Sequence, residues 1–209
     1  MSVLIGETAP DFQAETTKGP ISFHDWIGDS WAFFFSHPGA FTPVCTTEMG
    51  RTAQLADRFA ALDTKPIGLS TDTVEEHLKW IGDINDTQST NVGFPIVADP
   101  DLRVAKLYGM IHPAESETAA VRTVFIIDPK KQGRLTMTYP MSVGRNFDEI
   151  LRAITALQTS DGKRLSMPAD WQPGKDAIIP PSISNADAKS LYPQGWNELR
   201  PYLRLTKTQ

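Results

Sequence analysis

The sequence contains one cysteine, Cys45, within the stretch "HPGAFTPVCTTEMG" at residues 37–50. Thr42 followed by Pro43 is typical of a helix N-cap and the first helical residue. This register puts Val44 second and Cys45 third in the helix. There, unpaired backbone N–H groups and the helix dipole stabilise an anion. A thiolate is the nucleophilic form of cysteine, so the spacing favours a reactive sulfur.

A second interpretation of Cys45 stays open at this point. Free cysteines are often small, inert, buried hydrophobic residues. Pro38 and Pro43 stiffen the approach and bring no N–H donors, so they can shield one side of the sulfur from water. A single cysteine forms no intrachain disulfide and no cysteine-rich zinc site, and a C-x-x-C redox motif is absent. We expect neither a metal nor a cofactor.

The segments around Cys45 must position it. "WAFFFS" at residues 31–36 has the length and apolarity of a buried strand, and helical spacing follows it from Thr42 to Leu62. Thr73 and Glu76 form a capping box that opens another helix. The remaining expected elements are strands at 66–70 and 94–99, a helix at 100–110, a hairpin over 122–140 and a helix at 147–158. This alternation predicts an α/β sheet of mixed direction.

Composition narrows the class of protein. The chain has 209 residues, a net charge of −5 and 40% hydrophobic residues, which fits one large domain or one domain with an appendage. The acidic balance argues against nucleic-acid binding, and no apolar run reaches the roughly 18 residues of a membrane span. The N-terminus lacks the basic start of a signal peptide. We therefore expect a cytoplasmic protein, in a reducing compartment that suits a free thiol.

The composition and the hydrophobic periodicity of the chain change near residue 160. The segment after it is rich in proline and loop signals and shows little periodicity. We predict a main domain at residues 1–160. Residues 161–209 are expected to be an extension that packs on that domain or on a second subunit, because about 50 such residues would be marginal alone.

The segment Pro38–Cys45 resembles the P-x-x-x-[T/S]-x-x-C signature of the peroxiredoxins. "SHPGAFTPVCTTEMGR" as a whole resembles their one-cysteine, peroxiredoxin six-type subgroup within the AhpC/TSA-like peroxidases. "VRTVFIIDPKKQGRLTMTYP", "VGRNFDEILRAITALQ" and "PADWQPGKDAIIPPS" extend the likeness over nearly the whole chain. The resemblance implies a thioredoxin-like fold, with a mixed central sheet flanked by helices and a C-terminal extension. The activity it implies is reduction of hydrogen peroxide and organic hydroperoxides.

The resemblance also implies roles for individual residues. Cys45 is the peroxidatic cysteine, Thr42 the hydroxyl that binds the peroxide, and Arg122 the guanidinium that holds thiolate and peroxide. The supporting residues are Pro38 as a shield, Val44 beside the cysteine, His37 beside the pocket, and Glu48 and Arg145 as the ion pair that orients the arginine. On residue type alone, the preferred interpretations are a surface charge at a strand edge for Arg122 and a solvated helix-face residue for Glu48.

Attack on peroxide leaves a sulfenic acid, which ordinarily condenses with a second thiol. This chain has no second thiol, so we expect an external reductant: glutathione, a thioredoxin-type protein or ascorbate. An apolar extension also calls for a partner, and we expect a homodimer or a larger ring.

Two other functions deserve comparison. The subgroup includes a phospholipase, and His24 and Ser30 stand at matching positions. However, Ala32 replaces the second glycine of the G-x-S-x-G motif, and Lys130 occupies the aspartate position, with Asp128 nearby. The sequence favours a turn-capping role for Ser30 and a half-exposed strand for His24.

The second alternative is a holdase chaperone in an assembled form. The apolar residues that could serve it are Ile178, Ile179 and Trp196 in the extension. Burial of the same residues in a dimer interface is the simpler interpretation.

Overall fold

The aromatic segment that precedes Cys45 forms the central strand of a five-stranded sheet. The computed structural model describes residues 3–208. Strand β3 (Trp31–Ser36) pairs in parallel with β4 (Thr64–Ser70), and β4 pairs in parallel with β5 (Ile96–Ala98). On its other side β3 pairs antiparallel with β6 (Arg122–Ile127), which forms a hairpin with β7 (Gly133–Tyr139). The order β5-β4-β3-β6-β7 confirms the predicted sheet of mixed direction.

Both faces of β3 are covered, which explains why its sequence is apolar throughout. Successive side chains of a strand point to opposite faces. Phe34 packs on one face with Phe23 and Tyr108. Phe33 lies on the other face, where its ring stacks on Phe59 with centroids 5.1 Å apart. All six residues of β3 are buried, so the strand is a rigid base for the loop that follows it.

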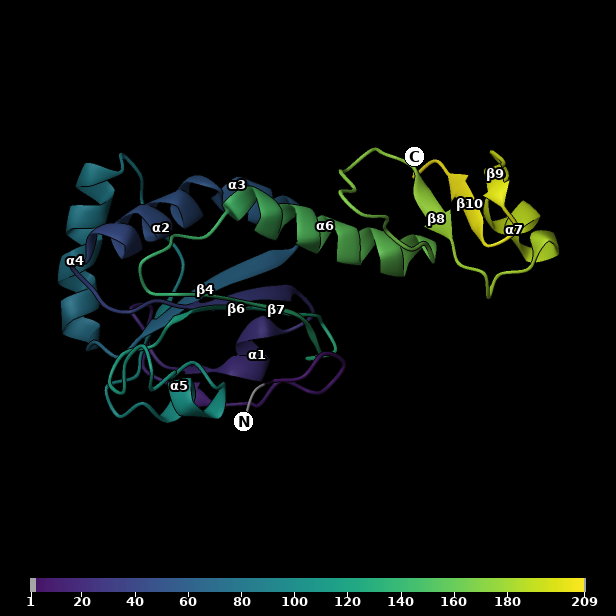
Figure 1. Cartoon of the computed structure of the whole chain (residues 1–209). Coiled ribbons are helices and arrows are strands. Elements are labelled where there is room, and N and C mark those ends of the chain that lie inside the picture. Colours follow the sequence, from purple (N-terminus) through teal and green to yellow (C-terminus); the bar gives the residue numbers. More distant parts are fainter. Residues whose placement is uncertain (1–2, 209) are drawn as a thin grey trace. The chain divides into compact units, whose positions relative to one another are not determined.

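Helices lie on both sides of this sheet (Figure 1). Helices α2 (Pro43–Gln54) and α3 (Ala56–Ala61) lie on one side, and α1 (Phe23–Ile27) and α5 (Arg103–Leu107) on the other. Helix α4 (Val74–Thr87) begins with the predicted capping box. The helical spacing predicted one continuous helix from Thr42 to Leu62, but Leu55 interrupts it and separates α2 from α3.

A short ribbon precedes the main sheet. Strands β1 (Gln13–Ala14) and β2 (Ile21–Ser22) pair antiparallel, joined by residues 15–20. The expectation that His24 lies on a strand was wrong, because this residue is in α1. Phe23 and Ile27 are fully buried, and their spacing of four residues fits one helical face.

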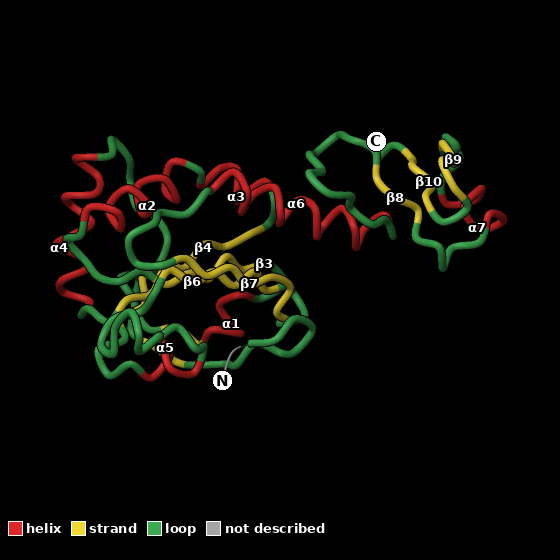
Figure 2. The backbone as a smooth tube through the Cα atoms, viewed as in Figure 1, coloured by secondary structure: helices red, strands yellow, loops and turns green. Residues whose placement is uncertain are grey.

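The chain divides into two compact units, Met1–Phe147 and Asp148–Gln209. The second unit contains most of α6 (Phe147–Lys163) and a sheet of order β8-β10-β9. Its other elements are β8 (Ala177–Ile179), α7 (Asn185–Leu191), β9 (Asn197–Arg200) and β10 (Leu203–Thr206), shown in Figure 2. The predicted division near residue 160 stays a prediction.

The second unit has more order than its sequence indicated. A cluster of buried residues that includes Leu165, Ile179 and Tyr192 forms a small core, on which Trp196 packs. Periodicity missed this sheet because its strands are only three or four residues long. No helix in the described part of the chain is long and apolar enough to cross a membrane.

Candidate active site

The loop that carries the peroxiredoxin-like signature starts at the end of β3. The N–H of His37 donates to the carbonyl of Leu69 at 2.9 Å, which continues the pairing of β3 with β4 by one residue. Both parallel strands end at this edge of the sheet. In α/β sheets this is where ligands usually bind. Residues 37–42 cross the edge, and α2 begins at Pro43.

Cys45 is the third residue of α2 and is fully buried. Thr42 has the extended backbone of an N-cap (φ −111°, ψ 145°), as predicted. Its hydroxyl, however, makes no cap and donates instead to the carbonyl of Gly39 at 2.9 Å. Because the first N–H groups of a helix have no intrahelical acceptor, Thr42 leaves them available to an anion beside the sulfur.

Arg122, the first residue of β6, lies beside Cys45. Its Nη1 is 3.4 Å from the cysteine Sγ and donates at 2.8 Å to Oε2 of Glu48. Its Nε and Nη2 both donate to the carbonyl of Met141, at 3.0 and 2.7 Å. Only 2% of Arg122 is exposed, so the alternative of a surface charge at a strand edge was wrong.

Glu48 joins Arg122 to Arg145. The carboxylate of Glu48 accepts hydrogen bonds from Nε and Nη2 of Arg145, at 2.9 and 2.5 Å, and from its backbone N–H at 2.8 Å. Burial alone would raise the pKa of Glu48, but the guanidinium of Arg145 and then that of Arg122 outweigh it. The pKa of Glu48 therefore lies below its ordinary value. Arg145 also donates to the carbonyl of Ser36 at 2.9 Å and so ties this cluster to the end of β3.

The charges of this cluster do not cancel. Arg122 and Arg145 are two cations, and Glu48 is one anion, so the three side chains carry one net positive charge. All three are at least nine-tenths buried, where an unbalanced charge is costly. A thiolate at Cys45 makes the cluster neutral, whereas a thiol leaves it charged.

The other predicted residues lie around this centre. Val44 lies so close to Gly144 that a Cβ on this glycine would be 3.3 Å from Val44 Cγ1. Pro38 is half-buried in the loop. The ring of His37 is fully buried against Trp80, with centroids 5.2 Å apart. Burial, and then the charge of Arg145, lower the pKa of His37 to about 4, so this ring is neutral at pH 7.

Sequence reasoning missed several residues here. The carbonyl of Met141 takes two hydrogen bonds from Arg122, and no side-chain motif signals a backbone acceptor. Ser70 is the last residue of β4, and Asp72 follows it at the edge where residues 37–42 follow β3. Asp72 accepts from the N–H of Ala40 at 2.8 Å. Polar residues just after a parallel strand are a usable signal, and they point to this edge.

The residues of the phospholipase alternative have other partners. The Ser30 hydroxyl donates to Asp63 Oδ1 at 2.8 Å, and Nε2 of His24 contacts the carbonyl of Ala9 at 2.8 Å. Asp128 accepts from the N–H of Gln132 and from Arg134. These contacts do not form the relay that a serine hydrolase requires.

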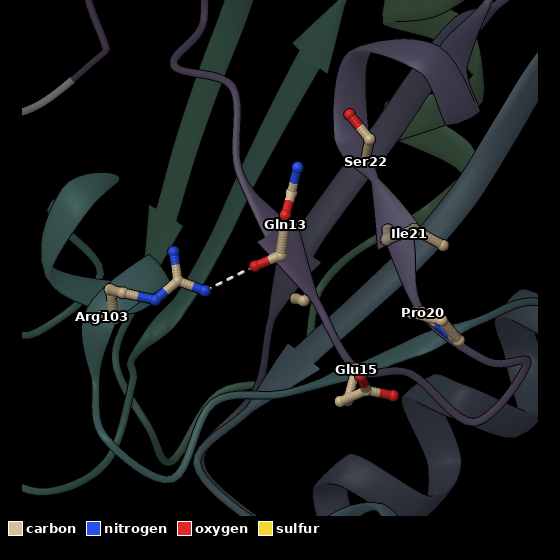
Figure 3. A pocket seen from close by; sticks show the side chains of 7 residues that line it. Gln13, Glu15, Pro20, Ile21, Ser22 and Arg103 are labelled. Carbon is tan, nitrogen blue, oxygen red and sulfur yellow. Dashed lines mark hydrogen bonds between the residues drawn. The ribbon is translucent and has the colours of Figure 1, made fainter.

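A hollow of about 480 Å³ lies elsewhere on this unit, beside the β1–β2 ribbon (Figure 3). None of the eight predicted site residues lines it. Arg103 points its guanidinium at the backbone of β1 and donates to the carbonyl of Gln13. The hollow therefore adds nothing to the thiol site. No cluster of three metal-binding side chains occurs among residues 3–208.

The fold and the site define a class of protein: a thioredoxin-like α/β domain that holds a single cysteine beside an arginine at the start of a helix. The AhpC/TSA family model matches residues 5–134 of the sequence. The model of the C-terminal domain of 1-Cys peroxiredoxin matches residues 156–195. The chain belongs to the AhpC/TSA family, and the resemblance inferred from its motifs is confirmed.

Named relatives match over nearly the whole chain. The sequence is 46% identical over 202 residues to the 1-Cys peroxiredoxin of Dictyostelium discoideum, covering 97% of this chain and 84% of that protein. It is 45% identical over 217 residues to human peroxiredoxin-6, covering 98% and 97%.

Solved structures agree with this assignment. The yeast mitochondrial 1-Cys peroxiredoxin superposes with a TM-score of 0.92 at 49% identity, covering 98% of this chain and 99% of that one. A cysteine-to-serine mutant of peroxiredoxin 6 from Arenicola marina gives 0.93 at 40%, covering 100% and 99%. The protein is thus a thiol-dependent peroxidase that works with one cysteine.

Proposed function

We propose that Cys45 is the peroxidatic cysteine and that Thr42 and Arg122 bind the peroxide beside it. Arg122 Nη1, 3.4 Å from Cys45 Sγ, is the observation that carries this assignment, because it places a fixed cation at the reacting sulfur. Glu48 and Arg145 hold that cation in place. Pro38, His37 and Val44 enclose the site.

The chemistry follows from these positions. The thiolate attacks one peroxide oxygen, an S–O bond forms, and the O–O bond breaks. Sulfur is oxidised to a sulfenic acid, and the other oxygen leaves as an alkoxide or hydroxide, which takes up a proton to become alcohol or water. Negative charge develops on the leaving oxygen. Fixed donors near it, namely the Arg122 guanidinium, the Thr42 hydroxyl and first-turn N–H groups, lower the barrier. Arginine suits this task because it stays charged and is planar.

Replacement of the two central groups tests this proposal. Cys45→Ser should abolish peroxide reduction. Arg122→Met should slow the single-turnover reaction of hydrogen peroxide by more than about 10-fold, because one fixed donor is lost. Arg51→Met changes an exposed arginine of α2 and serves as the matched control. A wild-type rate in Arg122→Met would show that Arg122 takes no part in peroxide reduction.

We also propose that an external donor reduces the sulfenic acid, since the chain has no second cysteine. The yeast relative is described as resolving its thiol through glutathione and thioredoxin systems. Glutathione, a thioredoxin-type protein and ascorbate are the three candidates here. Steady-state turnover with each donor in turn identifies the donor. No turnover with any of the three would contradict this part of the proposal.

The assembly we propose is a homodimer in which residues 161–209 contact the partner subunit. Ile179 and Trp196 pack on the core of their own unit, so they are not the side chains that a partner would cover. Leu191, Leu199 and Tyr202 are exposed in the same unit and are suited to that role. The holdase alternative relied on Ile178, Ile179 and Trp196, and this packing of two of them weakens it. Sedimentation of Tyr202→Ser tests the interface, with a monomer as the expected result.

The compartment we propose is the cytoplasm, on the basis of the acidic composition and the free thiol. One yeast relative carries a mitochondrial name. Fractionation of the source cells, with detection of the protein in each fraction, separates the two locations.

A further inference from the structure

Asp72 bonds to the loop that leads into α2, although it belongs to another part of the chain. Its Oδ2 accepts a hydrogen bond at 2.8 Å from the backbone N–H of Ala40, 32 residues earlier. A Cβ on Gly39 would meet both carboxylate oxygens, at 3.7 and 3.9 Å. The carboxylate therefore lies directly against the middle of the loop that carries Thr42.

Two buried residues orient this carboxylate. The Ser70 hydroxyl is 2.6 Å from Asp72 Oδ2 and 2.6 Å from Nε2 of His77. Ser70 and His77 are both fully buried. Burial, and then the neighbouring His37, lower the pKa of His77 to about 4, so the ring is neutral at pH 7.

The single proton of the Ser70 hydroxyl fixes the direction of these bonds. A carboxylate only accepts, so Ser70 donates to Asp72 and must accept from the Nε2–H of His77. The Nδ1 of His77, which has no hydrogen-bond partner among the described residues, is then the unprotonated nitrogen. The relay runs from His77 through Ser70 to Asp72 and on to the loop.

Serine, histidine and aspartate are also the residues of a hydrolase triad, but this connectivity excludes that role. In a hydrolase the histidine accepts the serine proton, and the aspartate binds the histidine. Here the serine donates to the aspartate instead, and its hydroxyl is fully buried. The cluster can hold a structure, but it cannot present a nucleophile.

The loop has a reason to need such a restraint. Phe41, between Ala40 and Thr42, has φ 57°, a left-handed conformation that costs a non-glycine residue roughly 1–2 kcal/mol. Phe41 is 55% exposed, and its ring meets that of Trp80 with centroids 6.5 Å apart, so only part of the residue packs to hold the backbone. Such strain persists only where surrounding contacts over-determine it.

Helix α4 also holds the start of α2. Trp80 lies on α4, about one turn after His77, and its Nε1 donates to the Thr46 hydroxyl at 3.1 Å. Thr46 in turn donates from that hydroxyl to the Thr42 carbonyl at 2.8 Å. One side of α4 therefore restrains both the loop and the first turn that follows it.

We propose that Asp72 is a positioning residue for peroxide reduction: oriented by Ser70 and His77, it holds Ala40 and thereby places the Thr42 hydroxyl for the incoming peroxide. This inference rests on the proposed function, because it assumes that Thr42 and Cys45 meet the substrate. The substrate does not touch Asp72.

Two reactions of Cys45 test the proposal. Hydrogen peroxide needs the Thr42 hydroxyl, whereas alkylation by iodoacetamide needs only the thiolate. Asp72→Ala should slow the peroxide reaction by roughly 10- to 100-fold, as small misplacements do, and change alkylation little. Asp72→Asn keeps an oxygen that can accept from Ala40 and should restore most of the peroxide rate. Asp86→Ala, an exposed position on α4, is the matched control.

Other outcomes would overturn the inference. An unchanged peroxide rate in Asp72→Ala would show that the loop holds itself. Equal losses in both reactions would show general loosening around the cysteine. Should Asp72→Ala fail to fold, Asp72→Ser carries the same expectations, because its hydroxyl is too short to reach Ala40. A wild-type protein that alkylates but does not react with peroxide would instead refute the proposed function.

Discussion

Arg145 makes three hydrogen bonds to Glu48, two from its guanidinium and one from its backbone N–H. Both side chains are almost fully buried. Oε2 of the Glu48 carboxylate also accepts a hydrogen bond from Arg122. Glu48 therefore connects the arginine beside the sulfur to an arginine bound to the end of β3. The geometry of the thiol site depends on this carboxylate.

Replacement of Glu48 should lower stability as well as activity. Glu48→Gln keeps the size of the side chain but leaves two buried guanidinium groups without a counter-charge. We expect a loss of roughly 3–5 kcal/mol in the free energy of unfolding, measured with urea. Glu75→Gln removes an exposed partner of Lys79 and is the control, for which we expect no measurable change. Similar stability of the two variants would contradict the structural role of Glu48.

The buried histidines should make the protein less stable in mild acid. The pKa of His37 is about 4 in the folded protein, against 6.5 for a free side chain, mainly because burial disfavours the cation. Between these pH values the unfolded chain binds more protons, so stability falls as pH decreases from about 6.5 to about 4. Each such histidine contributes a slope of at most about 1.4 kcal/mol per pH unit. His77 has the same direction and a similar pKa.

Urea unfolding at several pH values measures this slope. His37→Leu removes one of the two groups and should flatten the slope between pH 4 and 6.5. His112→Leu replaces an exposed histidine and should leave it unchanged. If both variants keep the wild-type slope, His37 is already protonated or accessible in the folded state.

The hydroxyl of Thr42 should matter more than its methyl group. Thr42→Ser keeps a donor for Gly39 or for peroxide and should retain most activity, whereas Thr42→Val should lose most of it. Thr47→Val is the control, because Thr47 makes a similar bond to the Val44 carbonyl at 2.7 Å but is exposed. Stopped-flow peroxide reduction compares the variants. Equal rates in all of them would limit Thr42 to a backbone role.

Thiol counting tests the one-cysteine mechanism. One equivalent of peroxide should consume one thiol per chain, and a dimedone-type probe should then label each chain once. Cys45 is fully buried, so we expect no disulfide between two native subunits. Excess peroxide without a donor should oxidise Cys45 further to sulfinic and sulfonic acids. Mass spectrometry distinguishes all of these species. Stoichiometric disulfide-linked Cys45–Cys45 dimers would contradict the external-donor mechanism.

The sequence predicted the parts of the site that depend on local rules. Thr42 and Pro43 marked the start of α2 correctly, because N-cap preferences act within a few residues. The strand and hairpin that flank the site were also predicted from apolar runs and turn residues. The resemblance then singled out Arg122 and Glu48, which their residue types alone could not distinguish from surface charges.

Local rules of this kind do not predict contacts between segments that are far apart in the sequence. The carbonyl of Met141 and the carboxylate of Asp72 reach the site only because the sheet brings their segments together, and neither belongs to a motif. The break at Leu55 also escaped, since the apolar spacing continues through it. Tertiary packing decided these features.

The single excess positive charge around Cys45 has a consequence for the catalytic cycle. A thiolate matches that charge, but a protonated sulfenic acid does not, so the first oxidation leaves an uncompensated cation in the interior. A sulfinate is again an anion and restores the balance. The net charge of Arg122, Arg145 and Glu48 is therefore balanced by a thiolate and by a sulfinate. The neutral sulfenic acid between these two states is the one that the cluster does not match.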